Sequence, residues 1–471
     1  MKILFATAEA GPFIRTGGLG DVAGALPPAL AKAGEELAVI LPLYEDMKAD
    51  FRNSLNYVGS VIVPLGWRQQ YAGLFKCEYN GVTYFFVDNE YYFKRKGLYG
   101  HFDDGERFAF LSKAVLELIP MMDFYPDVIH CNDWQTALIP TMLDAYYRDV
   151  DGYKFIKTIL TIHNIEFQGK MDKYVIDNVF GIPESHASIV EYNGAANMLK
   201  AGIESSNKVV TVSPTYAGEI LDPYYAYGLE DILNARQYKL SGIVNGIDVD
   251  LYNPVSDKAL FTNYTPRATA KRRENKYGLQ KLMGLPVVDK PIIGMVTRLT
   301  SQKGIDLVLE VLDEILNLDV QVVVLGTGDF KFENALKEYS ANYPTKLATA
   351  IYFSGDIASK IYAGSDIFLM PSKYEPCGLS QMIAMRYGSI PVVRETGGLK
   401  DTVIPYDHTT GKGVGFTFKT YNAYDMLDAI KRAYYMYQDK DQWKKVVKNA
   451  MGSDFSWDKS AQEYINIYKS L

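Results

Sequence analysis

Cysteine is scarce in this chain. Among its 471 residues there are three, Cys77, Cys131 and Cys377, which are widely separated and odd in number. Their spacing does not match the paired cysteines of a disulfide framework. We therefore expect free thiols and a reducing, cytoplasmic location.

Long hydrophobic runs are absent as well. No apolar stretch approaches the roughly 20 residues that a membrane helix needs. The first ten residues place apolar side chains after a lysine and so mimic a signal peptide, but the run is short, and Glu9 and Arg15 interrupt it. This pattern predicts a buried first strand and no membrane partner.

Positive charge is not in excess. Lys and Arg number 49 against 56 Asp and Glu, which gives a formal net charge of -7. Because a nucleic-acid binder needs clustered Lys and Arg, this balance argues against a nucleic-acid partner. Hydrophobic residues make up 48% of the chain. That fraction is ordinary for a soluble globular protein, and the length suggests two or three domains.

The first glycine loop lacks the Gly-x-Gly-x-x-Gly pattern of dinucleotide-binding proteins, which weighs against a dehydrogenase. Instead, Thr-Gly-Gly-Leu-x-Asp occurs twice, at residues 16–21 and 396–401. Each copy follows a strand-like run and leads into a helical pattern, where bare amides and the helix dipole can bind an anion. Two such loops predict two nucleotide-fold domains that share one cleft, and a phosphorylated donor. The alternative is a pair of tight turns without a ligand.

Apolar runs without alternation recur between helical patterns along the chain. Such runs are typical of parallel strands covered on both faces, so we predict an α/β protein with two doubly wound domains. The expected strands are 3–7, 37–41, 128–131, 158–163, 209–213, 292–297, 320–325, 367–370 and 390–393. Apolar and polar residues alternate more regularly in 58–64 and 71–87 than in these runs. Together with Asn80-Gly81, this pattern predicts an antiparallel hairpin inside the first domain.

Four residues of the first glycine loop are candidates for phosphate binding. Gly17 and Gly18 let a ligand approach the backbone, and Arg15 supplies a permanent cation. Asp21 can cap the following helix or accept a hydrogen bond from a substrate hydroxyl.

Polar residues also follow two central strands of the first half. His163 ends the run 158–163, and the carboxyl ends of parallel strands face the ligand crevice. His163 could donate to a sugar hydroxyl, although an ordinary core histidine is the alternative. The cluster at residues 130–134 has the composition of a metal site, but its spacing is not that of zinc, so we expect no metal.

The second half has two candidate loops. Arg298 and Lys303 flank the end of a strand, where two cations can hold a diphosphate and stabilise it as it leaves; a solvated basic loop is the alternative. Glu375 ends the loop that follows a later strand and could accept hydrogen bonds from the donor's sugar, beside the amides of Gly378 and Leu379. Cys377 reads as a small buried hydrophobe rather than a nucleophile.

Together these stretches resemble the bacterial glycogen synthase and plant starch synthase family. The matching motifs are Thr-Gly-Gly-Leu near the start, Thr-Ile-His-Asn, Asn-Gly-Ile-Asp, Arg-Leu-x-x-Gln-Lys-Gly, Glu-Pro-Cys-Gly-Leu and Thr-Gly-Gly-Leu-x-Asp-Thr-Val. The resemblance covers essentially the whole chain. Glu-Pro-Cys-Gly-Leu together with the two Thr-Gly-Gly-Leu copies is highly specific.

The resemblance implies a GT-B architecture, with two Rossmann-like doubly wound domains facing an interdomain cleft. Residues 1–243 would form the acceptor side, 244–456 the nucleotide-donor side, and 457–471 a helix that crosses back to the first domain. The implied reaction transfers glucose from ADP-glucose to the non-reducing end of an α-1,4-glucan such as glycogen, with retention of configuration. No cofactor is implied.

The resemblance also implies residue roles. Arg298 and Lys303 would bind the donor phosphates, Glu375 would bind the glucose hydroxyls, and His163 would contact the sugar near the anomeric centre. Phe353 stands where the family places an aromatic ring against adenine. The implied donor-binding residues are Arg15, Gly17, Gly18, Asp21, Asn164, Asn245, Phe353, Cys377, Gly378, Leu379, Thr396 and Gly397. The family usually has Lys where this chain has Arg15, which keeps the charge but changes its geometry.

Two other functions fit part of the pattern. One is a UDP-glucose transferase of the same architecture that makes a small glycoside, and the other is a glucan-binding protein without activity. For the enzyme, the sequence shows no second well-placed carboxylate of the kind retaining hydrolases use. We therefore expect the acceptor hydroxyl to enter on the face from which the diphosphate leaves.

Overall fold

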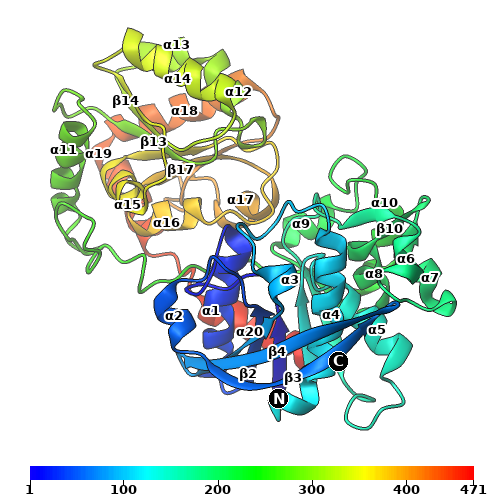
Figure 1. Cartoon of the computed structure of the whole chain (residues 1–471). Coiled ribbons are helices and arrows are strands. Elements are labelled where there is room, and N and C mark those ends of the chain that lie inside the picture. Colours follow the sequence, from blue (N-terminus) through cyan, green and yellow to red (C-terminus); the bar gives the residue numbers. More distant parts are fainter. The chain divides into compact units, whose positions relative to one another are not determined.

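The computed structural model describes residues 1–471, and the chain divides into two compact units. Met1–Gly246 and Trp457–Leu471 form the first unit, and Ile247–Ser456 forms the second (Figure 1). The domain boundaries predicted from the sequence lie after residues 243 and 456.

The first unit is built on a nine-stranded sheet in the order β12-β11-β7-β6-β1-β2-β5-β4-β3. Its strands are β1 Lys2–Ala6, β2 Glu36–Pro42, β3 Asn56–Leu65, β4 Arg68–Tyr79, β5 Val82–Asp88, β6 Val128–Asn132, β7 Lys157–Ile162, β11 Lys208–Thr211 and β12 Leu240–Gly242. From β12 to β5 all neighbours pair in parallel. A separate sheet has the order β8-β10-β9; its strands are β8 Lys170–Asp172, β9 Glu191–Tyr192 and β10 Ala195–Asn197.

The predicted hairpin is confirmed at one edge of this sheet. β4 pairs antiparallel with both β3 and β5. The β4–β5 turn has Asn80 at φ 49° and Gly81 at φ 76°, and two successive positive φ values are what a tight two-residue hairpin turn requires.

Helices complete the first unit. They are α1 Gly18–Lys32, α2 Ala49–Asn53, α3 Glu90–Phe93, α4 Asp104–Met122, α5 Leu138–Tyr146, α6 Val175–Asn178, α7 Glu184–Val190, α8 Met198–Ser205, α9 Pro214–Glu219, α10 Glu230–Ala235, the 3-10 turn η1 Gln237–Lys239, and α20 Trp457–Lys469. The last helix, α20, packs against α1 (Figure 1). Its Tyr464 and Tyr468 are buried, and Tyr468 shares a 2.7 Å hydrogen bond with His130 of β6.

The second unit has a six-stranded sheet in the order β15-β14-β13-β16-β17-β18. Its strands are β13 Ile292–Val296, β14 Gln321–Leu325, β15 Leu347–Ala350, β16 Ile367–Met370, β17 Ile390–Arg394 and β18 Phe416–Phe418. All of its pairs are parallel. Numbered along the chain, this is the 3-2-1-4-5-6 order of a Rossmann-like domain.

The helices of the second unit connect these strands. They are η2 Thr269–Lys271, α11 Arg272–Leu282, η3 Ser301–Lys303, α12 Ile305–Glu310, α13 Leu312–Asn317, α14 Phe330–Asn342, α15 Gly355–Gly364, α16 Ser380–Arg386, α17 Gly397–Thr402, α18 Ala423–Gln438 and α19 Lys440–Met451.

The cores explain why these runs become strands. In β1, Ile3, Leu4 and Phe5 are fully buried, and β14 is buried throughout. Continuous apolar runs bury both faces of a parallel strand, and helices on both sides provide the contacts. All nine predicted parallel strands are present. None of the helices combines the length and the hydropathy that crossing a bilayer requires.

Candidate active site

In the second unit, the candidate residues gather where the strand order reverses. β13 lies between β14 and β16, so the connections leaving β13 and β16 start in opposite directions. This switch point, at the carboxyl edge of the sheet, is where α/β proteins bind ligands. The loop after β13 carries Arg298 and Lys303, and the segment after β16 carries Glu375.

Lys303 and Glu375 form an ion pair at this edge. The Lys303 Nζ lies 2.6 Å from Glu375 Oε2, with the two side chains 16% and 9% exposed. The Ser372 hydroxyl donates to the same carboxylate oxygen at 3.0 Å. A pair this short and this buried holds both groups in place, and it presents a cation and a carboxylate side by side.

Backbone contacts fix the two loops to each other. Gly304 has φ +75°, and a Cβ there would collide with the carbonyl oxygen of Pro371. The Lys373 amide donates to the Gln302 carbonyl at 2.8 Å. The glycine after Lys303 is therefore required by the close approach of the segment that carries Glu375.

Arg298 is exposed and forms no ion pair. Its Nη2 donates to the side-chain oxygen of Gln302 at 3.3 Å. An exposed guanidinium at the switch point, without a carboxylate, is available to an anionic ligand.

The second Thr-Gly-Gly-Leu copy has glycines for a structural reason. Gly397 has φ +44°, and a Cβ on it would collide with the Glu375 carbonyl, while one on Gly398 would collide with the Cys377 carbonyl. The Gly398 amide donates to that same Glu375 carbonyl at 3.2 Å. This copy therefore packs tightly on the Glu375 segment, and its preceding Thr396 is buried.

Other predicted residues of the second unit differ in exposure. Cys377 is buried, as expected for a small apolar side chain. Gly378, at φ +73°, and Leu379 lie just before α16 and are half-buried. Phe353 follows β15 and is 93% exposed, so packing within the unit does not explain its ring.

In the first unit, the first copy of the motif follows β1. Arg15 Nη1 lies 2.5 Å from Asp21 Oδ1. The Thr16 amide donates to the buried carboxylate of Glu9 at 2.5 Å. Burial raises the pKa of Glu9, and hydrogen bonds from Thr16 oppose that rise. Burial likewise raises the pKa of Asp21, against the effect of Arg15.

Gly17 and Gly18 differ from their counterparts in the second copy. A Cβ on either residue would meet nothing within 4 Å, and neither has a positive φ. Neither packing nor backbone conformation therefore explains these two glycines. Both residues are exposed at the start of α1, and the Gly17 amide hydrogen-bonds the Glu9 carboxylate; ligand binding at this loop stays a prediction.

His163 lies just beyond β7, in a hydrogen-bonded network. Its Nε2 is 2.9 Å from Asn132 Oδ1, and its amide donates to Asp133 Oδ1 at 2.7 Å. Burial lowers the pKa of His163 to about 3, so the ring is neutral at pH 7. Because Asn132 Oδ1 accepts from Nε2, the other ring nitrogen, Nδ1, is an acceptor rather than the donor that the sequence suggested.

Asp133 supports this turn. Burial raises its pKa to about 7, and bonds from the His163 and Asn164 amides oppose that rise. Asn164 Oδ1 accepts from the Glu166 amide at 3.0 Å. Asn245, in the segment after β12, is buried, and its Oδ1 has no hydrogen-bond partner.

The polar cluster at residues 130–134 is structural. The ring of His130 bridges Tyr468 and Thr161, at 2.7 Å to each hydroxyl. Burial lowers the pKa of His130 to about 3, and His163 adds to the effect. No three His, Cys, Asp or Glu residues of the chain are grouped so that they could hold a metal ion.

Comparison with known proteins identifies the family. Residues 2–235 match the starch synthase catalytic domain, and residues 284–450 match the glycosyl transferases group 1. A glycogen synthase of Clostridium acetobutylicum is 52% identical, and one of Lactobacillus acidophilus is 50% identical, each over 100% of both chains. The chain belongs to the glycogen synthase and starch synthase family.

Solved structures agree with this membership. The catalytic domain of starch synthase IV from Arabidopsis thaliana, bound to ADP and acarbose, superposes with a TM-score of 0.91 at 33% identity, over 100% of this chain and 99% of that one. Sucrose-phosphate synthase from Thermosynechococcus elongatus shares the fold at a TM-score of 0.62 and 16% identity, over 99% and 98% of the two chains. This member of the glycogen synthase family has the predicted GT-B fold, with two Rossmann-like domains. The shared cleft stays a prediction.

Sequence reasoning missed Arg394 and Tyr421 in the second unit of this glycosyltransferase. Arg394, at the end of β17, donates to the Lys373 carbonyl at 2.6 Å. The Tyr421 hydroxyl lies 2.9 Å from the Ser301 carbonyl and 2.7 Å from the Asp306 carboxylate. Both brace the loops that carry Lys303 and Glu375. A strand-end arginine was the only sequence signal for either.

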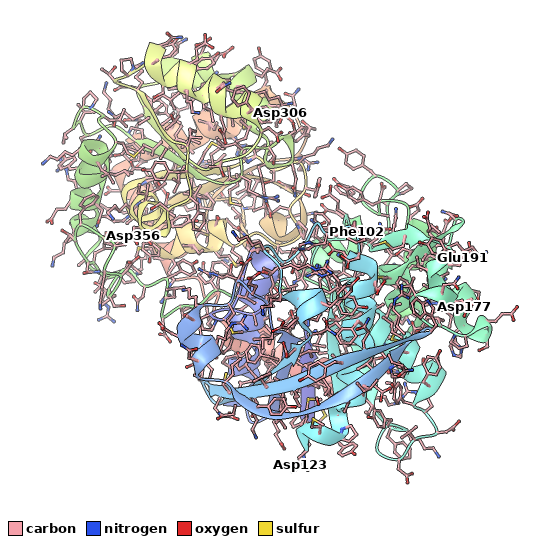
Figure 2. The ribbon with its side chains drawn as sticks, viewed as in Figure 1. Phe102, Asp123, Asp177, Glu191, Asp306 and Asp356 are labelled. Atoms are coloured by element: carbon pink, nitrogen blue, oxygen red, sulfur yellow. The ribbon has the colours of Figure 1, made fainter.

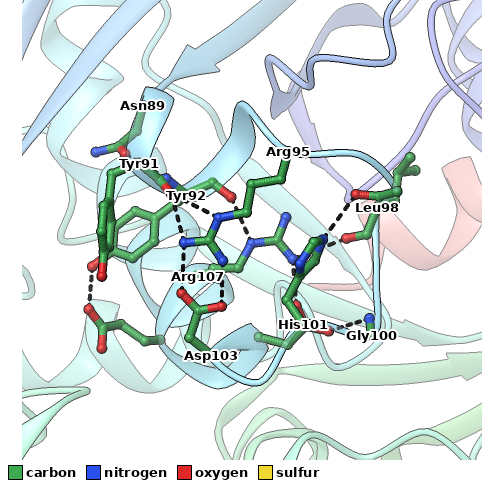
Figure 3. Close-up of polar contacts among 12 residues, drawn as sticks. Asn89, Tyr91, Tyr92, Arg95, Leu98, Gly100, His101, Asp103 and Arg107 are labelled. Atoms are coloured by element: carbon green, nitrogen blue, oxygen red, sulfur yellow. Dashed lines mark hydrogen bonds and ion pairs between the residues drawn. The ribbon is translucent and has the colours of Figure 1, made fainter.

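The loop between α3 and α4 was missed as well. Figure 3 shows Arg95 held by Asp103 at 2.6 and 2.9 Å, while Arg107 donates to the Tyr92 carbonyl at 2.8 Å. Arg107 is fully buried and pairs with Asp104. This network holds a loop on which Phe102 is 94% exposed (Figure 2), so a rigid base presents an aromatic ring to solvent.

Proposed function

We propose that this protein transfers glucose from ADP-glucose to the non-reducing end of an α-1,4-glucan such as glycogen, with retention of configuration. The observation that carries the proposal is the 52% identity to a glycogen synthase over the whole of both chains. The geometry of the second unit suggests how its residues would serve that reaction.

Arg298 and Lys303 would bind the donor's diphosphate. Both lie at the switch point, and Arg298 has no carboxylate partner. Breaking the bond between the sugar and the phosphate builds negative charge on the leaving diphosphate, and fixed cations stabilise that charge. The amides of Gly378, Leu379 and Gly397 would add donors. The helices α16 and α17 are short, so these individual amides matter more than a helix dipole.

Glu375 would bind the glucose hydroxyls. Its carboxylate is held by Lys303 and Ser372, which leaves lone pairs for a sugar hydroxyl next to the cation that takes the phosphate. The Lys303–Glu375 ion pair would thus fix the distance between the cation that binds the donor's phosphate and the carboxylate that binds its glucose.

The first unit would supply the acceptor side and further donor contacts. Arg15, Gly17, Gly18 and Asp21 form a loop whose glycines are open, which suits an approaching phosphate. His163 would contact the sugar near its anomeric carbon, through its backbone carbonyl or the accepting Nδ1. Asn164 and Asn245 would complete this set, and the unpaired Oδ1 of Asn245 would accept a hydrogen bond from a sugar hydroxyl.

The transfer itself would occur on one face of the sugar. The bond between the anomeric carbon and the diphosphate oxygen breaks, and the acceptor oxygen bonds to the same carbon from the same side. The acceptor's proton passes to the departing diphosphate. Retaining hydrolases use a pair of carboxyl groups, as nucleophile and acid; here His163 is neutral and the Glu375 carboxylate is already bound by Lys303 and Ser372. Trapping a glucosyl adduct on Glu375 or Asp21 would contradict this route.

Adenine recognition would involve Phe353. An aromatic side chain that is 93% exposed can stack on a base, and the starch synthase IV neighbour holds ADP.

A cytoplasmic location would fit the three free thiols, Cys77, Cys131 and Cys377, since thiols persist in a reducing compartment.

The choice of donor and acceptor tests the proposal. ADP-glucose and UDP-glucose are each offered with glycogen and with small glycoside acceptors, and nucleoside diphosphate release is measured. We expect rapid release from ADP-glucose with glycogen. Preferred use of UDP-glucose with a small acceptor would favour a different glycosyltransferase, and no release with any pair would favour a binding protein.

A further inference from the structure

A second charged pocket lies within the second unit, away from the candidate active site. It has a volume of about 410 Å³ and is bordered by α11, α18, α19 and the ends of two loops. Figure 1 shows α18 and α19 next to each other on this unit, with α11 beside them. A volume of this size is within the range of small-molecule sites, roughly 300–1,000 Å³.

The pocket is at the opposite edge of the sheet from Lys303 and Glu375. Two of its lining residues, Asp289 and Asp366, precede β13 and β16, so they stand at the amino ends of these parallel strands. The candidate active site stands at their carboxyl ends. The pocket and the candidate active site are therefore separated by the length of one strand, about 15 Å.

Positive charge dominates the lining. Five cationic side chains face two carboxylates, the cations being Arg272, Arg273, Lys276, Lys440 and Lys444. Lys276 is buried and pairs with Asp366 at 2.9 Å, and Arg273 pairs with Asp289 at 3.3 Å. Lys276 also lies 3.7 Å from Asp289, and both lining carboxylates attract Lys440, so five cations share two carboxylates.

Two of these cations lie on α19, where Lys444 pairs with Asp441 at 3.7 Å. Lys440 is the first residue of α19, and Lys444 follows one turn later. A cation near a helix N-terminus faces the positive end of the dipole and is unfavourable there. Lys440 Nζ instead sits 3.5 Å from the centre of the Tyr437 ring. Burial lowers the pKa of Lys440 and nearby Lys276 adds to the effect, while the carboxylates of Asp289 and Asp366 oppose it. Because the five cations outnumber the two lining carboxylates, an anion in the pocket would offset the remaining positive charge.

The pocket is also lined by aromatic side chains and a carboxylate, which favour a ligand with more groups than a bare anion. Tyr437 and Trp443 line the pocket with ring centroids 5.3 Å apart, and both are buried. Lys440 and Lys276 lie 3.5 and 5.2 Å from the centre of the Tyr437 ring, so this ring is not open for a base to stack on. The exposed carboxylate of Asp289, which pairs with Arg273 and Lys276, can accept further hydrogen bonds from hydroxyls.

We propose that this pocket binds a hexose monophosphate, with its phosphate on Lys440, Lys444 and Arg273, its hydroxyls on Asp289, and its carbon face against Trp443. The proposal does not depend on the transferase activity. It adds a ligand site that is separate from the donor site.

Calorimetric titration of the full-length protein tests this site. Glucose 1-phosphate and glucose 6-phosphate are titrated with ADP in excess, which occupies the donor site, and orthophosphate, glucose and AMP are titrated alongside. We expect one saturable site for a hexose phosphate, at least about tenfold tighter than for orthophosphate or glucose, since a charged hydrogen bond contributes roughly 1.5–3 kcal/mol. No saturable hexose phosphate binding would overturn the proposal, and so would tighter binding of AMP.

Three variants locate the site. Lys440→Glu should weaken hexose phosphate binding by about tenfold or more while keeping the fold, because Glu suits the first position of α19. Lys445→Glu, exposed on the same helix and outside the pocket, should bind as wild type does. Lys303→Ala should also keep this binding, which separates it from the donor site. Equal binding by Lys440→Glu and wild type would overturn the proposal.

Discussion

Lys303 and Glu375 are 72 residues apart in the chain, yet the Lys303 ammonium lies 2.6 Å from the Glu375 carboxylate. The contact exists because β13 and β16 are neighbours at the switch point and because Gly304 lets the two loops touch. It joins the proposed phosphate-binding cation to the proposed sugar-binding carboxylate. Substitution of either residue should therefore affect both catalysis and stability.

Removal of the Lys303 ammonium should slow the reaction. Lys303→Ala is expected to reduce kcat about a hundredfold, because one fixed donor to the leaving group contributes roughly 3 kcal/mol to the transition state. The measurement is steady-state turnover with ADP-glucose and glycogen well below the melting temperature. Lys400→Ala, exposed in α17, is the control and should keep wild-type turnover. Unchanged kcat in Lys303→Ala would exclude the phosphate role.

The Lys303–Glu375 pair should be coupled energetically. Lys303→Met and Glu375→Gln should each lower the melting temperature, since each leaves a partly buried charge without its partner, a loss of about 3 kcal/mol. The double variant should lose clearly less than the sum of the two single losses. Thermal unfolding of the four proteins completes the cycle, and strictly additive shifts would mean that the pair is not formed in solution.

Arg15 should contribute to binding of the donor rather than to the stability of the folded protein. Arg15→Ala is expected to raise KM for ADP-glucose about tenfold, as loss of a charged hydrogen bond would, with an unchanged melting temperature because the side chain is 53% exposed. Arg15→Lys, the family's usual residue, should stay near wild type. Lys154→Ala, exposed elsewhere in the first unit, controls for general charge loss. A wild-type KM in Arg15→Ala would remove Arg15 from the site.

Phe353 should matter for the nucleotide alone. Phe353→Ala is expected to weaken ADP binding about tenfold, since stacking on a base contributes roughly 1–3 kcal/mol. Stability should not change because the ring is 93% exposed. Direct ADP titration measures the effect, with Tyr435→Ala, 64% exposed on α18, as the control. If both variants bind ADP as wild type does, adenine lies elsewhere.

Acid should destabilise the first unit through His130. Its pKa is about 3 in the folded protein and about 6.5 in the unfolded chain. Between these values the unfolded state binds the extra proton, so stability falls as pH falls, by about 1.4 kcal/mol per pH unit. His163 adds a similar effect. Asp133, whose pKa is raised to about 7, acts in the opposite sense between about pH 4 and 7.

His130→Gln isolates the first of these contributions. Glutamine can still bond to Tyr468 or Thr161 but does not titrate. Its melting temperature should therefore fall less between pH 7 and pH 5 than that of the wild type. An identical fall in both proteins would show that His130 is not held neutral.

The sequence predicted most of the fold, because continuous apolar runs identify buried parallel strands. It missed β15, since Leu-Ala-Thr-Ala is weak in β propensity. It also missed the strands of two or three residues, which are β8, β9, β10, β12 and β18. Such strands form because a neighbouring strand is already in place, which local pattern does not reveal.

The candidate site was predicted less completely. Motifs located Lys303 and Glu375 but not their ion pair, which depends on which strands are adjacent. Nor could the sequence tell the two Thr-Gly-Gly-Leu copies apart. The structure does: Gly397 is required by packing on the Glu375 segment, whereas Gly17 is free of such contacts. Tyr421 acts through long-range contacts and carries no local signal, and the only signal for Arg394 is its place at the end of a strand.

The most direct test of the central claim follows labelled glucose from ADP-glucose into glycogen, with β-amylase digestion of the product. The proposal predicts label that is incorporated by the wild type, released as maltose from non-reducing ends, and reduced about a hundredfold in Lys303→Ala. No incorporation by the wild type, or equal incorporation by the two proteins, would contradict it.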